Sequence, residues 1–133
     1  MMKGVHIRKL KPIEENDRGK VYEWCKGVDG KQVTVYLRNK SVKFGCHYHR
    51  GDDPSKNPER FFLIKGKVKL FAKNLKTGEE LETTIDEGTE ILIEPWIYHE
   101  MKALTNVIFI EYRKTPFKKE RVDSYKLSLD NKV

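Results

Sequence analysis

Apolar residues alternate along short segments of this sequence, and this pattern restricts the chain to β-structure. No segment of residues 1–114 repeats its apolar residues with the 3.6-residue period of an amphipathic helix. Residues 32–38 place Val33, Val35 and Leu37 on one face, as a strand does. Turn residues separate such segments at regular intervals. We therefore predict an all-β sandwich or barrel, with strands at residues 21–24, 32–38, 41–49, 61–64, 67–73, 81–85, 90–94 and 107–113.

The length of 133 residues fits one domain that can bury a core. We expect this domain to span residues 1–133, with its core at residues 17–114 and a polar, basic tail at residues 115–133. The sequence has neither a membrane-spanning apolar run nor a signal-peptide core at its start. Cys25 and Cys46 are expected to be reduced packing residues. These features predict a cytoplasmic protein without a membrane partner.

The formal net charge is +7, from 27 Lys and Arg against 20 Asp and Glu. Lysines are interspersed with glutamates along most of the chain, which is typical of a solvated surface and of thermophilic proteins. The excess of positive charge also suits the attraction of an anionic small molecule. No helix-turn-helix, zinc-finger or RNA-recognition motif accompanies the charge, so we expect no nucleic-acid partner.

Three of the four histidines belong to one set of candidate metal ligands. His47 and His49 point to the same face of a strand, a short distance apart. Glu59 follows ten residues after His49, and His99 lies behind a proline-containing turn. Imidazole and carboxylate ligands without a thiolate suit Zn, and also Mn, Fe or Ni. The sequence therefore predicts one divalent transition metal held by His47, His49, Glu59 and His99.

The same residues carry a resemblance to the cupin superfamily. The first cupin motif is a glycine, a His-x-His pair, and a glutamate followed after six residues by glycine, which the chain resembles at Gly45, His47, His49, Glu59 and Gly66. The second cupin motif is similar to the stretch that contains Gly88, Pro95 and His99. The resemblance implies a single cupin domain, which is a double-stranded β-helix or jelly-roll barrel.

Within the cupins, the chain resembles enzymes that modify nucleotide sugars. Arg18, Gly19 and Glu23 are similar to the N-terminal segment of dTDP-4-dehydrorhamnose 3,5-epimerases. The segments that resemble the C-terminal epimerase cupin of capsular-polysaccharide assembling enzymes are residues 47–49, 61–66, 95–99 and 116–125. That cupin is zinc-bound and acts on a 4-keto nucleotide sugar, which implies an isomerase or epimerase in polysaccharide biosynthesis.

Metal-free ketoisomerases of dTDP-sugar pathways share the His-x-His pair and use it as acid and base. This second resemblance implies catalytic roles for His47 and His49. Phe44 departs from the pattern, because many of these relatives have an arginine before the glycine.

These features together lead to one principal hypothesis, a metal-dependent isomerase or epimerase of a keto sugar, with an anionic nucleotide sugar as its partner. A base would remove the proton beside the ketone. The candidates for this base are Tyr48, Tyr98 and Tyr112, with packing roles as the alternative. The candidates for phosphate contacts are Arg38, Arg50 and Arg60, with surface roles as the alternative.

Two other classes of function fit the same ligand set. An Fe(II)-dependent cupin oxygenase would use the same four residues, and metal content with oxygen consumption separates it from an isomerase. A sugar-binding cupin without turnover would bind its ligand and exchange no proton. Fold alone does not choose among these three classes.

Two expectations concern the surroundings of the site. Val42, Phe44, Cys46 and Tyr48 alternate with the histidines, so we expect them to form an outward apolar face that a homodimer covers, with help from the N-terminal strand region. The segment of residues 50–58 is rich in turn-forming residues and lacks an apolar anchor. We expect it to be a mobile lid beside the metal.

Overall fold

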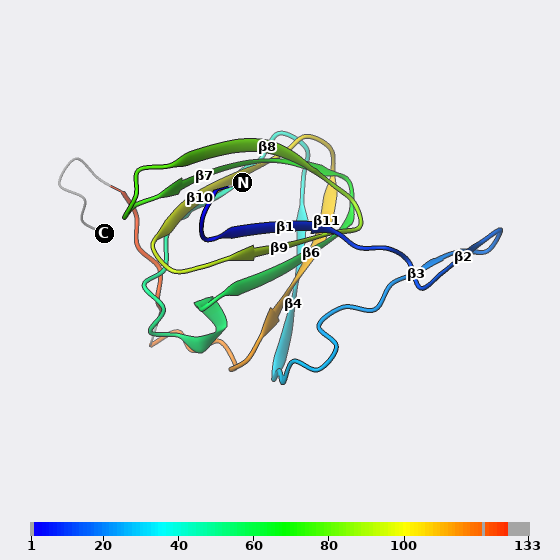
Figure 1. The fold of residues 1–133 in the computed structure, drawn as a ribbon, viewed down its shortest axis with the longest axis horizontal. Coiled ribbons are helices and arrows are strands. Elements are labelled where there is room, and N and C mark those ends of the chain that lie inside the picture. The colour runs from blue at the N-terminus through cyan, green and yellow to red at the C-terminus, as the bar shows by residue number, and fades with distance from the viewer. Residues whose placement is uncertain (1, 121, 128–133) are drawn as a thin grey trace.

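The chain folds into two antiparallel β-sheets that pack face to face in a computed structural model (Figure 1). The structure describes residues 2–120 and 122–127. Its strands are β1 (Val5–Lys9), β2 (Glu14–Asn16), β3 (Gly19–Val21), β4 (Gln32–Arg38), β5 (Lys43–His47), β6 (Glu59–Lys65), β7 (Lys67–Asn74), β8 (Glu80–Asp86), β9 (Thr89–Ile93), β10 (Ile97–Ala103) and β11 (Val107–Arg113). A 3₁₀ turn, η1 (Pro54–Lys56), precedes β6. Within the described residues, no helix is long and apolar enough to cross a membrane.

The order of the strands makes a jelly roll. One sheet has the order β1-β9-β6-β11-β4, and the other has the order β5-β10-β7-β8. Both sheets contribute to one core, which includes Leu63, Ile91 and Ile93 from the first sheet and Val68, Leu70 and Met101 from the second. Closing two sheets around a core leaves few free strand edges. The predicted all-β cupin barrel is confirmed.

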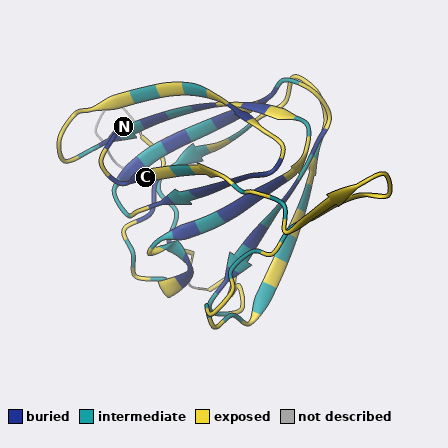
Figure 2. Cartoon of the chain, turned by 45° about the vertical axis from the view of Figure 1, so that its right-hand side comes forward, coloured by how far each residue is buried: buried dark blue, intermediate teal, exposed yellow. Residues whose placement is uncertain are grey.

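The hairpin of β2 and β3 lies apart from both sheets. It projects away from the body of the molecule, and all residues of its strands are exposed (Figure 1, Figure 2). The chain then returns to the outer face of the five-stranded sheet, where the rings of Tyr22 and Trp24 pack on Phe62. This outer face is therefore covered by the chain itself only in part.

Strand β4 has apolar side chains on its outer face and polar side chains on its inner face, the reverse of the usual pattern for a barrel strand. Val33, Val35 and Leu37 face outward and are 53%, 59% and 71% exposed. The alternate residues of the strand face the interior and are polar, apart from the ring of Tyr36: Gln32, Thr34, Tyr36 and Arg38. A strand with polar residues inside is suited to line a polar cavity, and its apolar outer face lacks a cover.

The predicted outward apolar face of β5 is interrupted at Phe44, because the strand does not alternate regularly. Gly45 and Cys46 both have positive φ angles, of 81° and 58°. The register with β10 slips at this point, so that Met101 pairs with Phe44 and His99 pairs with His47. One extra residue in a bulge turns Phe44 to the same side as His47. Phe44 accordingly stacks on the core residue Phe109, with ring centroids 5.3 Å apart.

Tyr48 is buried by the chain itself rather than by a partner. Its ring stacks on those of Trp96 and Tyr125, and its backbone forms a bridge with Tyr125. The C-terminal segment thus returns to cover the strand that carries the histidines. The remainder of the predicted tail, residue 121 and residues 128–133, lies outside the described residues.

The segment of residues 50–58 is firmly anchored, which corrects the expectation of a mobile lid. The side chain of Asp53 caps η1 and forms a 2.7 Å ion pair with the buried guanidinium of Arg113. Ser55 is fully buried and hydrogen-bonds to Thr115. Lys56 points inward to two carboxylates. The anchors are polar side chains distant in sequence, so the lack of apolar residues gave no sign of them.

The carboxylate of Asp123 holds the start of the same segment. It accepts hydrogen bonds from the backbone N–H groups of Arg50, Gly51 and Asp53, at 2.8, 2.8 and 3.1 Å. Asp123 itself is buried. The adjacent Asp52 is exposed and lies outside this network.

We predict that Asp123→Ala lowers the free energy of unfolding by about 2–3 kcal/mol, because it leaves partly buried N–H donors without an acceptor. Urea denaturation followed by tryptophan fluorescence measures the change. Asp52→Ala is the matched control and should stay within about 0.5 kcal/mol of the wild type. Equal stability of the two variants would mean that the segment is not held as the structure shows.

Candidate functional site

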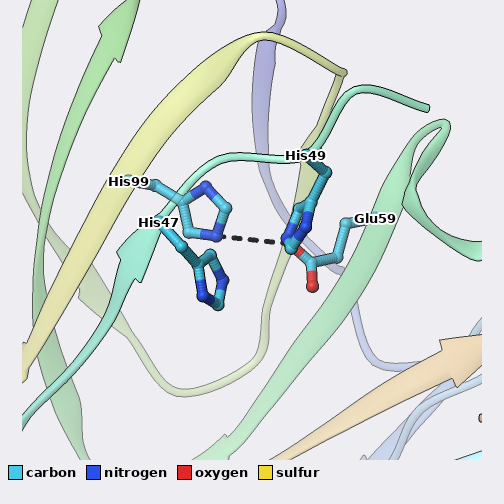
Figure 3. Close-up of side chains that lie close together, drawn as sticks. All are labelled: His47, His49, Glu59 and His99. Carbon is cyan, nitrogen blue, oxygen red and sulfur yellow. Dashed lines mark hydrogen bonds and ion pairs between the residues drawn. The ribbon is translucent and has the colours of Figure 1, made fainter. Parts of the chain in front are cut away.

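Strand pairing and the facing sheet bring the four predicted metal ligands together. His47 ends β5 and pairs directly with His99 of β10, and His49 follows two residues later. Glu59 begins β6 on the opposite sheet and points across to the imidazoles (Figure 3). One candidate ligand atom from each residue lies within 4.8 Å of the others. The cluster therefore spans the two sheets at one end of the barrel.

Backbone carbonyls fix the orientation of two of the rings. Nδ1 of His49 hydrogen-bonds to the carbonyl of Asp123, and Nδ1 of His99 hydrogen-bonds to the carbonyl of Ile97 at 3.1 Å. A carbonyl oxygen only accepts, so each Nδ1 carries the hydrogen. In the neutral ring the lone pair is then on Nε2, which faces the cluster. This is the arrangement in which protein histidines bind metals.

The carboxylate of Glu59 lies opposite these lone pairs. Its Oε1 atom is 3.1 Å from Nε2 of His49 and 3.3 Å from Nε2 of His99, and all three residues are about 2% exposed. Neutral imidazole nitrogens and a carboxylate oxygen repel one another at such distances unless a positive charge lies between them. A proton on one imidazole or a metal ion supplies that charge. The donor set, three imidazoles and a carboxylate with no thiolate, fits a divalent transition metal.

The protonation of the cluster follows from burial and from near charges. Burial and the neighbouring His99 and His49 rings lower the pKa of His47 to about 3, so this imidazole is neutral at pH 7. Burial opposes the ionisation of Glu59, but Lys56 and His49 outweigh it and hold the pKa of Glu59 well below its usual value. Burial also opposes the protonation of His49, but the charge of Glu59 outweighs burial and raises the pKa of His49.

A lysine and a second buried glutamate extend the cluster, and sequence reasoning missed both. Nζ of Lys56 lies 2.7 Å from Oε2 of Glu59 and 2.8 Å from Oε2 of Glu111. The hydroxyl of Tyr36 donates to Oε1 of Glu111 at 2.8 Å. Burial and then the charge of Glu59 raise the pKa of Glu111. Burial and then the charge of Glu111 raise the pKa of Tyr36, which keeps the phenol protonated.

Strand alternation could have found Tyr36 and Glu111. Tyr36 shares the inner face of β4 with its polar neighbours, and Glu111 alternates with outward residues of β11. Nothing in the sequence marks Lys56, because its position depends on how residues 50–58 are anchored.

Two hollows with shared lining residues adjoin the cluster. The larger one has a volume of about 340 Å³ and is lined by residues that include Tyr36, His47, His49, Lys56, Glu111 and Arg113. The smaller one, of about 90 Å³, is lined by residues that include Tyr36, Arg38, Phe44, His47, Glu59 and His99. The two volumes share Tyr36, His47 and Lys56. A small polar molecule placed there would touch both the histidines and the phenol of Tyr36.

The structure does not bring the predicted tyrosine bases to the histidines. Tyr98 lies on the opposite face of β10 from His99, and its hydroxyl donates to Glu100. Tyr112 lies on the outer face of β11, and its hydroxyl donates to the carbonyl of Val28. Strand alternation sends each of them outward next to an inward residue. Tyr48 faces away as well, stacked under the C-terminal segment.

Comparison with known proteins identifies the family. A family model described as the polysaccharide biosynthesis C-terminal domain matches residues 14–125. A search of curated proteins found no match.

Several solved structures share the fold. A dTDP-4-dehydrorhamnose 3,5-epimerase from Sulfolobus tokodaii superposes with a TM-score of 0.74 at 19% identity, over 98% of this chain and 81% of that chain. QdtA, a sugar 3,4-ketoisomerase from Thermoanaerobacterium thermosaccharolyticum in complex with TDP, gives 0.73 at 20% identity, over 98% and 92%. CapF with the inhibitor 3-isopropenyl-tropolone gives 0.62 at 22% identity, over 76% and 29%.

At these identities the solved structures establish the cupin fold, and the family model adds a match that covers most of the sequence. The chain therefore belongs to the polysaccharide biosynthesis C-terminal domain family, with the architecture of the epimerase and ketoisomerase cupins.

Proposed function

We propose that this protein is an isomerase or epimerase of a nucleotide-linked keto sugar, with a divalent metal bound by His47, His49, Glu59 and His99. The observation that carries the proposal is the convergence of imidazole Nε2 atoms on one buried carboxylate beside a hollow of about 340 Å³. The similar solved structures add support, since they include sugar epimerases and a ketoisomerase in complex with TDP-4-keto-6-deoxyglucose.

The metal that the residues favour is zinc, with manganese, iron and nickel as alternatives. His47, His49 and His99 would bind through nitrogen and Glu59 through oxygen. When bound, such an ion polarises a ketone oxygen and stabilises the negative charge that develops on it after proton removal. Lys56 keeps Glu59 ionised and oriented for this role.

Tyr36 and Glu111 replace the outward tyrosines as candidates for proton transfer. The phenol of Tyr36 lines both hollows with His47, and its hydrogen bond to Glu111 gives the proton a path to a buried carboxylate. Removal of the proton beside the ketone and its return to the other face gives epimerisation. Return to the neighbouring carbon gives a keto shift.

A metal-free form of the same reaction uses the histidines directly. His47 is neutral at pH 7 because of its depressed pKa, so its imidazole can accept a proton from the sugar. His49, charged through Glu59, would then serve as the acid. Metal content separates this form from the metal-assisted one. Oxygen consumption by an iron-loaded sample would instead support the oxygenase alternative.

The substrate proposed here carries a nucleotide diphosphate, in keeping with the TDP of the similar ketoisomerase complex and with the net charge of +7.

The two unpaired cysteines fit a cytoplasmic enzyme, because thiols stay reduced there.

The proposed assembly is a homodimer. The sequence predicted an interface at β5, and the interface proposed from the structure is the outer face of β4. Val33, Val35 and Leu37 form a contiguous apolar stripe, and the exposed Ile64 of β6 lies on the same sheet. β4 is also one of the two edge strands of its sheet in the described part of the chain. The projecting hairpin exposes the apolar side chains of Ile13 and Val21 at its base. These apolar side chains could cover the stripe on a second copy of the chain. A two-fold pair would satisfy both surfaces at once.

The first test is metal content. We predict about one transition metal per chain by elemental analysis, as a four-residue site requires. The double variant His47→Ala with His49→Ala should lose the metal. His6→Ala is the control and should keep it, because His6 is exposed and pairs with Glu94 at 2.7 Å. Full occupancy in the double variant would refute the four-ligand site.

The second test is proton exchange. Incubation with 4-keto nucleotide sugars in D₂O should place deuterium on the carbon beside the ketone. Tyr36→Phe should lower the rate of exchange by roughly 10²–10⁴-fold, as loss of an acid–base group does. Tyr98→Phe, the matched control, should leave the rate nearly unchanged. Absence of exchange with every such sugar would contradict the proposed reaction, and an equal effect of the two variants would contradict the role of Tyr36.

The third test is assembly. Wild-type protein should sediment as a dimer, and Val35→Lys with Leu37→Lys should sediment as a folded monomer. Val42→Lys introduces one lysine at a residue that is 40% exposed but lies off β4, so this variant should remain dimeric. A wild-type monomer, or a dimer that survives the double variant, would rule out this interface.

A further inference from the structure

The positively charged side chains that line the two hollows differ in whether they form ion pairs within the protein. Lys56 is held between Glu59 and Glu111. Arg113 is paired with Asp53 at 2.7 Å and donates through Nε to the carbonyl of Thr115. Both cations are therefore neutralised within the protein and have little charge left for a ligand.

Arg38 differs from both. It is the last residue of β4 and lines the smaller hollow together with His47, Glu59 and His99. None of the ion pairs found within residues 2–120 and 122–127 includes Arg38. Its Nε atom is shielded from solvent and has no hydrogen-bond partner within these residues. Such a donor group costs free energy until an acceptor arrives.

Two aromatic rings hold the guanidinium in place. Its central carbon is 5.4 Å from the centroid of Tyr36 and 5.2 Å from that of Phe44. Phe44 reaches this position only because the bulge at Gly45 and Cys46 turns it inward. Stacking uses the faces of a guanidinium and leaves its N–H edge available. Arg38 is therefore oriented by its neighbours, while its Nε–H group has no acceptor among the described residues.

We propose that Arg38 binds an anionic phosphate group of the ligand while the attached sugar lies against the histidine cluster. The planar fork of an arginine matches two phosphate oxygens, which gives both affinity and orientation. The assignment of the sugar to the cluster rests on the proposed function; the phosphate contact rests on the unpaired guanidinium. Arg38 is in this account a binding residue that fixes which end of the ligand enters the hollow.

The other two arginines that the sequence analysis named as candidates for phosphate contacts do not line the hollows as Arg38 does. Arg50 is exposed and stacks on Tyr125 at 3.9 Å, outside the barrel. Arg60 also has a shielded Nε without a partner, but it alternates with the inward Glu59 and Phe61 and so lies on the outer face of β6. Arg60 is consequently a close control for Arg38.

Calorimetric titration with thymidine diphosphate and with inorganic pyrophosphate tests the proposal. Arg38→Gln should weaken the binding of both by about 10- to 100-fold, the loss expected for a charged hydrogen-bonding partner. Arg38→Lys should recover only part of the affinity, because an ammonium lacks the fork. Arg60→Gln should bind as the wild type does. Titrations with and without a chelator show whether a bound metal, rather than Arg38, is the anion's partner.

Several results would overturn the phosphate contact. These are wild-type affinity in Arg38→Gln, an equal loss in Arg60→Gln, or no binding of either anion by the wild type. Circular dichroism of each variant excludes a loss of fold, and Arg38→Lys provides a second variant of the same residue. Proton exchange reports separately on the proposed function. Anion binding that depends on Arg38 without exchange would refute the reaction alone, and exchange with unaltered binding in Arg38→Gln would refute the contact alone.

Discussion

The meeting of imidazole nitrogens with the buried carboxylate of Glu59 is the interaction on which the rest of the site depends. Backbone carbonyls fix His49 and His99 so that their Nε2 atoms face Oε1 of Glu59 at 3.1 and 3.3 Å. Such an arrangement requires a positive charge at its centre. Lys56 satisfies the other carboxylate oxygen from outside the ring of histidines, which leaves the centre free for a proton or a metal.

The surrounding structure supports this constraint through polar contacts made over long distances in sequence. Asp123, near the end of the described chain, binds the N–H groups that follow His49 and offers its own carbonyl to that ring. Arg113 on β11 holds Asp53, and this ion pair presents Lys56 to the two glutamates. Residues 50–58 thus form one wall of the site, and the polar inner face of β4 lines the same hollow.

Local sequence patterns were enough to predict the fold and the cluster. Strand alternation and turn residues identified β4 to β9 and β11 but missed β1, β2 and β10. The motif around His47 and His49 identified the candidate ligands that the structure brings together. The failures have physical causes. The bulge at Gly45 and Cys46 broke the alternation that would have turned Phe44 outward. The anchors of residues 50–58 are distant polar partners, which no local pattern contains.

The central claim is that the histidine cluster is one preformed cation site, and nitrogen-15 NMR of histidine-labelled protein titrated with Zn²⁺ tests it directly. Before metal is added, neutral His49 and His99 rings should carry their hydrogen on Nδ1. At one equivalent of zinc, the Nε2 resonances of His49 and His99 and a ring-nitrogen resonance of His47 should shift together, while those of His6 should not change. Absence of a hydrogen on Nδ1 of the metal-free His49 or His99 ring, or zinc shifts confined to His6, would contradict the account.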